Sequence, residues 1–186
     1  MEAAKEMSMA KNAGTDAGAD GWVLHVYEAY SARVYRFMMY RTGHVQASED
    51  LTGAVFMRII EKRHSFDEGR GSLDVWVFTV ARHILADYMR SSRRKHVSLD
   101  ELEGSAASGV TLETHVEQRL QVQMLLEAVG RLKPREAGII SLKYAGGLKN
   151  AEIAKVMKLS EKNVGVILSR CRKRLKELLL EEEENI

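Results

Sequence analysis

The sequence predicts an all-α protein: two small helical domains joined by a flexible acidic linker, with a helix-turn-helix in the C-terminal domain. Three observations predict this fold class. The 186 residues include a single proline, so few helices would be interrupted. Apolar residues recur at three- and four-residue steps, as on the buried face of an amphipathic helix. Hydrophobic residues make up 45% and charged residues 29% of the chain, which is typical of a globular protein that buries a core.

The N-terminal block, residues 21–95, follows a stretch that we expect to be disordered. Residues 1–20 are small, polar and aperiodic, and bury too little apolar area to offset the entropy of ordering. A first helix then ends near Gly43. Ser48 is the expected N-cap of a second helix, with Glu49 and Asp50 near the positive end of its dipole.

A third long helix follows the loop at residues 66–72, which contains two glycines. Ser72 is its expected N-cap, and its end is basic. We expect one stripe of this helix to face the core, and the other face to carry polar and aromatic residues. The core stripe consists of Leu73, Trp76, Val80, Ile84 and Tyr88, and the other face of Phe78, Arg82, His83, Asp87 and Arg90.

A linker is expected at residues 96–115, and we place the domain boundary there. Its composition is rich in glycine, serine and alanine between residues 104 and 109. Residues 97–117 also carry five acidic side chains and no lysine or arginine. The linker is therefore predicted to be flexible and acidic.

The C-terminal block is expected at residues 116–180, with an acidic tail at 181–186. An amphipathic helix is interrupted at Gly130, and Pro134 stands at a typical first position of the next helix. Glycines at 146 and 147 form a stop signal.

A helix-turn-helix is predicted near the end of this block. Asn150 can cap a short helix, and Ser160 can cap a longer basic one. A short helix, a tight turn and a basic second helix are typical of this DNA-binding unit.

Charge is strongly segregated, although the formal net charge is only +2. Residues 81–95 carry a balance of +4 and residues 162–176 a balance of +6, with the acidic stretch between them. Two basic helices separated in this way favour two contacts with a polyanion. The alternative is that each basic run is a solvated helix face.

No enzymatic constellation is present in the sequence. The six histidines are scattered, and there is no metal-ligand spacing, phosphate-binding loop or nucleophile elbow. We therefore expect no catalytic residue, no metal and no cofactor. Cys171 is the single cysteine, so the chain can form no internal disulfide. The flanking arginines could lower the pKa of its thiol and make it reactive; the alternative is that Cys171 is a buried residue of helix packing. Without a long apolar run or a signal segment, we expect a cytoplasmic protein with no membrane insertion.

Two sets of motifs, in series, resemble the extracytoplasmic-function (ECF) sigma factors of bacterial RNA polymerase. Region two of that family is similar to EDLT at residues 49–52, VF at 55–56, FD at 66–67, RGSL at 70–73, WVFTVAR at 76–82, DYMR at 87–90 and RRK at 93–95. Region four is similar to LKPRE at 132–136, YAGGL at 144–148, EIA at 152–154 and LSRCRKRL at 168–175.

The resemblance implies partners and contact residues. Core RNA polymerase would be bound by Glu49, Asp50, Leu51 and Phe56, although Leu51 and Phe56 have domain core as their alternative. The promoter's minus-ten element, recognised and melted, would be contacted by Phe66, Arg70, Phe78, Arg82, His83, Asp87, Arg90, Arg93, Arg94 and Lys95, with Trp76 assigned to the core. The minus-thirty-five element, read as duplex, would be contacted by Lys162, Asn163, Val166, Arg170, Arg172, Lys173 and Arg174.

The family also implies roles for the linker and a further partner. The acidic linker would mimic nucleic acid and thread toward the active centre of the polymerase, with a passive tether as the alternative. An anti-sigma factor is a possible partner.

The chain departs from the family pattern at two places. Gly53 stands where the family usually has glutamine. Gly165, Val166 and Ile167 stand where it usually has a basic and polar trio, so base hydrogen bonding from these positions is not expected. Upstream recognition then either rests on Lys162, Asn163, Arg170 and Arg172 or is weak.

Two other functions fit parts of the sequence. LSEKNV at residues 159–164 also resembles the helix-turn-helix of LuxR-type regulators, which act without binding core polymerase. The N-terminal block discriminates, because it resembles no sensor or receiver domain. A helical adaptor for an acidic partner is the third interpretation, and it predicts no salt-dependent affinity for DNA.

Overall fold

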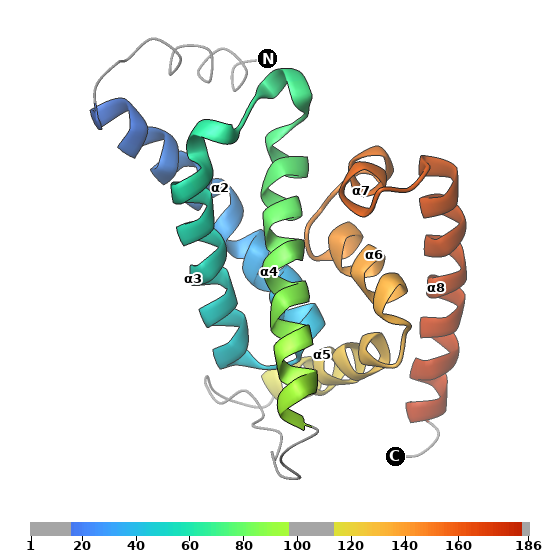
Figure 1. Cartoon of the computed structure of the whole chain (residues 1–186). Helices are drawn as coiled ribbons and strands as arrows, with labels where there is room; N and C mark the ends of the chain where they lie inside the picture. Colours follow the sequence, from blue (N-terminus) through green and yellow to red (C-terminus); the bar gives the residue numbers. More distant parts are fainter. Residues whose placement is uncertain (1–15, 97–113, 184–186) are drawn as a thin grey trace. The chain divides into compact units, whose positions relative to one another are not determined.

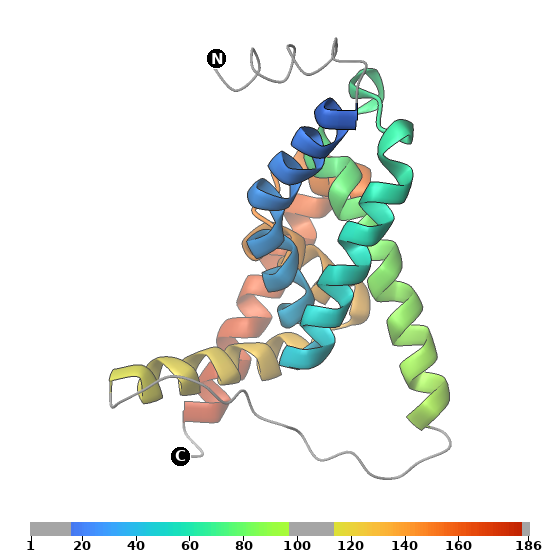
Figure 2. The same ribbon diagram turned by 90° about the vertical axis from the view of Figure 1, so that its left-hand side faces the viewer.

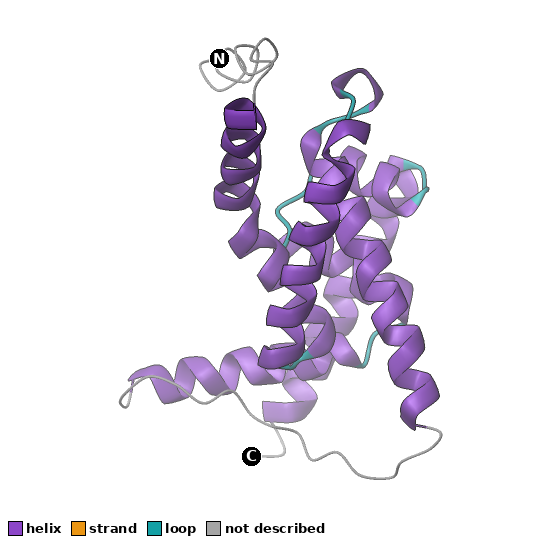
Figure 3. Ribbon diagram, turned by 60° about the vertical axis from the view of Figure 1, so that its left-hand side comes forward, coloured by secondary structure: helices purple, strands orange, loops and turns teal. Residues whose placement is uncertain are grey.

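The computed structural model describes residues 16–96 and 114–183, with side chains described for residues 21–92 and 121–181. Every regular element in these ranges is helical (Figure 3), which confirms the all-α prediction. The elements are α2 (Asp16–Thr42), α3 (Val45–Lys62), the 3-10 turns η2 (Arg63–Ser65) and η3 (Glu68–Arg70), α4 (Leu73–His96), α5 (Thr114–Gly130), α6 (Pro134–Tyr144), α7 (Asn150–Met157) and α8 (Glu161–Glu183).

Two predicted boundaries differ from the helix ends. The predicted N-terminal tail included residues 16–20, but α2 begins at Asp16; residues 1–15 lie outside the described part. α8 continues to Glu183, past the predicted start of the acidic tail at 181. Extending an existing helix needs far less free energy than nucleating one, so polar residues at its ends can join it. The predicted linker lies almost wholly outside the described residues, and the division into two domains stays a prediction.

The start of α3 corrects the predicted cap at Ser48. Gly43, with φ 65°, ends α2, and α3 begins one turn earlier than expected. The Nδ1 atom of His44 accepts a hydrogen bond from the Ala47 N–H at 3.3 Å, so His44 is the cap. Ser48 is fully buried, and its hydroxyl donates to the His44 carbonyl at 2.7 Å. It also lies 2.8 Å from the Thr42 hydroxyl.

The other predicted helix signals are mostly confirmed. The Ser72 hydroxyl accepts from the Val75 N–H at 3.4 Å and caps α4. The Ser160 hydroxyl accepts from the Asn163 N–H at 3.2 Å and caps α8. Gly147, with φ 71°, lies in the turn after α6.

The predicted cap at Asn150 is wrong. Asn150 is the first residue of α7, and its Oδ1 atom is buried with no hydrogen-bond partner in the described part of the chain. The Glu152 carboxylate instead accepts from the Lys149 N–H at 2.7 Å. A glutamate three residues into a helix can satisfy the free donor at its start, which leaves Asn150 without a capping role.

The chain divides into two compact units, residues 1–32 and residues 33–186. The core of the second unit is formed by packing between its helices. α3 and α4 run antiparallel and pack side by side (Figures 1 and 2). α8 packs against α5, α6 and α7, and α7 also contacts α4. The buried residues of these helices include Leu51, Val55, Ile59, Val77, Phe78, Ala81, Leu85, Ile139, Ile140, Leu142, Ile153, Val156, Val164, Leu168, Cys171 and Leu178.

Cys171 belongs to this core. Its side chain is 1% exposed, and burial, with a smaller effect from the Glu136 carboxylate, raises the pKa of the thiol to about 11. The thiolate that a reactive cysteine needs is therefore scarce at neutral pH. This favours the packing role over an activated thiol.

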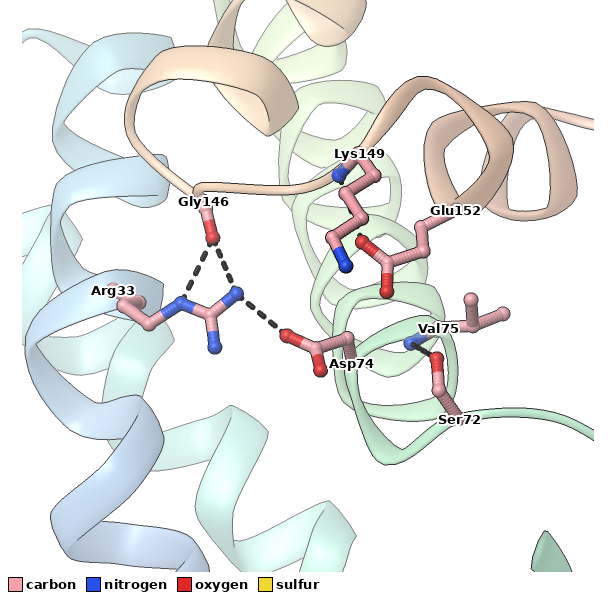
Figure 4. A network of polar contacts seen from close by, with 7 residues as sticks. All are labelled: Arg33, Ser72, Asp74, Val75, Gly146, Lys149 and Glu152. Carbon is pink, nitrogen blue, oxygen red and sulfur yellow. Dashed lines mark hydrogen bonds and ion pairs between the residues drawn. The ribbon is translucent and has the colours of Figure 1, made fainter. Parts of the chain in front are cut away.

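Arg33 of α2 holds together two segments that are distant in sequence (Figure 4). Its guanidinium donates to the Gly146 carbonyl at 2.7 and 2.9 Å and to the Asp74 carboxylate at 2.6 Å. The same guanidinium lies 5.3 Å from the centre of the Phe78 ring. The Arg33 and Asp74 side chains are 25% and 28% exposed, so water competes for them only in part.

Gly146 has no room for a side chain at this point. A Cβ atom added there would lie 2.8 Å from the Leu142 carbonyl oxygen and 2.9 Å from Phe78. The backbone after α6 can therefore approach α4 and the Arg33 guanidinium only because residue 146 is glycine.

We predict that Arg33→Ala destabilises the protein. Charge-assisted hydrogen bonds to partly buried groups contribute more than surface ion pairs, so the loss should be about 1–3 kcal/mol. Urea unfolding followed by circular dichroism measures it. Arg58→Ala is the matched control, because its 3.5 Å pair with Glu61 is exposed and should contribute about 0.5 kcal/mol or less. Equal midpoints for the two variants would contradict the role given to Arg33.

Candidate nucleic-acid interface

The rotation of α4 decides which of its residues can meet another molecule. The predicted outer face combined Phe78, Arg82, His83, Asp87 and Arg90, but at about 100° per residue these five span roughly half of the helix circumference. Phe78 is fully buried and packs edge-on against Phe37, with ring centres 5.8 Å apart. The assignment of Phe78 to DNA is therefore wrong, because the ring fills the core.

Trp76 was expected in the core, yet its side chain is only half-buried. It packs on Phe66, with ring centres 5.5 Å apart and planes inclined by 52°. Phe66 comes from the turn between η2 and η3, so a half-exposed aromatic pair joins that turn to the start of α4. Such a pair offers faces on which an unstacked base could lie.

Three predicted minus-ten residues form an exposed set that we name the α4 surface: His83, Asp87 and Arg90. Arg90 pairs with Asp87 one turn away. Arg82 is half-buried beside this surface, with a terminal nitrogen 3.1 Å from the His83 ring and a buried Nε atom that lacks a partner in the described part. Guanidinium groups of this kind are strong donors to phosphate oxygens.

His83 lies in a positive environment. Burial, together with the charges of Arg82, Lys158 and Lys62, lowers its pKa, and Asp87 opposes this shift. The ring is therefore mainly neutral at pH 7. Lys158 and Lys62, at the ends of α7 and α3, were not among the predicted site residues; their nearness depends on packing between distant segments.

The remaining predicted minus-ten residues divide into two groups. Arg70 is highly exposed, with 86% of its side-chain surface accessible, and lies 3.5 Å from Asp67 in the turn before α4. Arg93, Arg94 and Lys95 lie in the last turns of α4, where side chains are outside the described part, so their contacts stay a prediction.

On α3 the predicted contacts with core polymerase divide between its two faces. Leu51 and Phe56 are each only 7% exposed and pack in the core, which corrects their assignment as contact residues. Glu49 and Asp50 are exposed. Met57, which was not among the predicted contacts, is 61% exposed on the same side of the helix.

We name Glu49, Asp50, Gly53 and Met57 the α3 surface. These positions recur at three- and four-residue steps and all are exposed. The signal that could have found Met57 is its position in this series, which falls between the buried pair at 55–56 and Ile59.

All seven predicted minus-thirty-five residues are exposed on α8. The buried stripe of this helix faces α5, α6 and α7, so its opposite side is open. Lys162, Val166 and Lys173 lie near the middle of the open side, Asn163 and Arg170 lie next to them, and we name these five the α8 surface. Arg172 and Arg174 flank it, and Arg174 lies 3.4 Å from Glu177.

Among the side chains described, at residues 21–92 and 121–181, no three His, Cys, Asp or Glu come together as metal ligands. No described helix combines the length and the apolar character needed to span a bilayer. The described helices present exposed charged and apolar faces.

Comparison with known families assigns both halves of the chain. Residues 26–95 match the family model of sigma-70 region 2, which covers α3, α4 and most of α2. Residues 122–175 match that of sigma-70 region 4, which covers α6, α7 and most of α5 and α8. The α3 and α4 surfaces thus lie in region 2, and the α8 surface in region 4.

Individual proteins agree with this assignment. The chain is 33% identical over 155 residues to the ECF RNA polymerase sigma factor BldN of Streptomyces coelicolor, covering 83% of this chain and 59% of that protein. It is 30% identical over 153 residues to the ECF RNA polymerase sigma factor SigM of Bacillus subtilis, covering 82% of this chain and 92% of that protein.

A solved structure supports the fold. The sigma factor RpoE from Bartonella quintana, in complex with the anti-sigma factor NepR, matches with a TM-score of 0.64 and 24% identity, covering 86% of this chain and 95% of that one. From the two regions in series and the match along nearly the whole of SigM, we conclude that the chain belongs to the ECF family of RNA polymerase sigma factors.

Proposed function

We propose that this chain binds core RNA polymerase and directs it to a class of promoters, with region 2 opening the minus-ten element and region 4 reading the minus-thirty-five element. One observation supports this proposal above all: both sigma-70 regions are present, and each carries exposed helix surfaces whose side chains suit the expected partners. The chain would do no covalent chemistry of its own, and it would act in the cytoplasm, where the polymerase is.

The α4 surface and the Phe66–Trp76 pair suit a melted strand. Removing a base from the stack costs a few kcal/mol, and stacking on a protein ring returns about 1–3 kcal/mol per base. Phe66 and Trp76 supply half-exposed rings. Arg70, Arg82 and Arg90 supply cations for the phosphates, so strand capture and backbone binding come from adjacent elements.

The α8 surface suits duplex DNA. The second helix of a helix-turn-helix enters the major groove, where side chains near its N-terminal end reach base edges. Lys162 and Asn163 lie in the first turn of α8. Arg170, Arg172 and Lys173 follow in the next turns and can contact phosphates, which fix register and orientation.

The α3 surface suits a protein partner. It combines two carboxylates with an exposed methionine and a glycine, and Met is a residue type enriched in protein interfaces. We assign this surface to core RNA polymerase. An anti-sigma factor is a further expected partner, as the RpoE relative is seen with NepR.

The match to sigma-70 region 2 weighs against the LuxR-type alternative, which would not need that region. It also weighs against a helical adaptor that binds only an acidic protein. Both alternatives predict that adding the chain gives core polymerase no promoter specificity.

The direct test is run-off transcription from genomic promoter fragments with purified bacterial core polymerase. We expect promoter-specific products only when the chain is added, and co-elution of the chain with core during gel filtration. Absence of both a specific product and co-elution would reject the proposal.

The α3 surface generates a second prediction. Met57→Asp should reduce the fraction of the chain that co-elutes with core polymerase at least tenfold, because the new carboxylate lies where the partner must exclude water. The melting temperature should stay unchanged, since Met57 is 61% exposed. Leu180→Asp is the matched control, as Leu180 is 49% exposed on α8 and belongs to none of the named surfaces. Equal loss of binding in both variants would refute the assignment.

His83 generates a prediction for pH dependence. Its pKa is lowered in the free protein, and a nearby phosphate would raise it, so binding DNA should take up a proton. Affinity of the holoenzyme for promoter DNA should therefore rise as the pH falls from about 8 to 6. His83→Gln should flatten this dependence, whereas His25→Gln, which removes an exposed histidine of α2, should preserve it. A slope that survives in His83→Gln would place His83 away from DNA.

A further inference from the structure

Gly165 is an interior helix residue that the fold does not require to be glycine. It lies five residues into α8, and its φ is not positive. A Cβ atom added there meets nothing within 4 Å, so no neighbouring helix needs the space. Glycine within a helix costs about 1 kcal/mol relative to alanine. Neither backbone conformation nor internal packing offsets this cost.

Val166 is the apolar residue that follows Gly165, beside the space that a side chain at residue 165 would fill, which we call the gap. It is 41% exposed and lies on the open side of α8, near its N-terminal end. The other exposed large hydrophobic residue of the helix, Leu180, lies about four turns away toward the C-terminus. Val166 is thus the apolar contact point of the part of α8 that would enter a DNA groove.

Cations surround Val166 on the same side of the helix. Lys162 lies one turn before it, Arg170 one turn after it, and Lys173 two turns after it, and all three are exposed. Glu161 lies before this segment and Glu177 after it, and Glu177 forms an ion pair with Arg174. An exposed apolar side chain flanked by cations is complementary to a base edge that lies between two phosphate backbones.

From these features we propose that Val166 reads the 5-methyl group of a thymine in the major groove, and that Gly165 lets the α8 backbone approach closely enough for this contact. Thymine is the base that presents an apolar group in the major groove, and its methyl group pairs with small apolar side chains. The missing polar trio then marks a change from hydrogen-bonded to apolar reading. This inference rests on the proposed function of region 4.

The test replaces single thymines of the upstream element by deoxyuridine, which removes only the methyl group. The DNA is a promoter fragment that gives a specific run-off product, and the protein is the full chain bound to core polymerase. Fluorescence anisotropy measures the dissociation constant for each substituted duplex. We expect one or two positions at which deoxyuridine weakens wild-type binding about fourfold, the effect of losing one buried methyl group.

Two variants link the effect to α8. In Val166→Ala the same deoxyuridine positions should have no further effect, whereas Val122→Ala, which shortens a 54% exposed valine of α5, should respond as wild type. Gly165→Gln should keep or raise the melting temperature and weaken promoter binding at least tenfold, because its side chain occupies the gap.

The outcomes separate the two levels of the account. If no fragment gives a specific product, the proposed function fails and the inference falls with it. If promoters are bound and transcribed but no deoxyuridine position matters, or Val166→Ala responds as wild type does, the thymine contact is overturned while the sigma-factor function stands.

Discussion

Burial of Phe78 is the interaction on which the α4 surface depends. The ring packs edge-on against Phe37, lies beneath the Arg33 guanidinium and fills the space that a side chain at residue 146 would need. An aromatic ring held on several sides fixes the rotation of its helix, because turning α4 would expose the ring and open a cavity. With that rotation fixed, His83, Asp87 and Arg90 point away from the core.

The same division between faces recurs in α3 and α8. Each helix buries one stripe and exposes positions three, four and seven residues apart, so a single helical period sets both the core and the surface. On α3 the exposed positions combine carboxylates with Met57, which suits a protein partner. On α8 they combine cations with Val166, which suits DNA. The chemistry of each exposed stripe, rather than the fold itself, separates the two proposed roles.

Sequence periodicity and cap chemistry predicted most of the fold, whereas contacts between distant segments were beyond them. Ser72, Ser160 and Pro134 act locally, and the helices begin where these residues predict. The burial of Phe78 and Trp76 was predicted wrongly because both are aromatic residues of one helix, and only packing against Phe37 and Gly146 decides that Phe78 is the buried one. His44 caps α3 in place of Ser48 because α2 ends before Gly43, which has a positive φ, and the next helix already begins at Val45.

The candidate site was predicted in outline, through the family motifs, and corrected by burial. Leu51 and Phe56 are buried, whereas Met57 is exposed on the same side of α3 as Glu49 and Asp50, which is why we propose Met57 as a contact. The most direct test of the two-faced arrangement is photo-crosslinking in the open promoter complex, with p-benzoylphenylalanine replacing Asp87 on α4 or Met57 on α3. We expect Asp87 to crosslink to the melted minus-ten strand and Met57 to core RNA polymerase. A DNA crosslink from position 57, or none from position 87, would contradict the account.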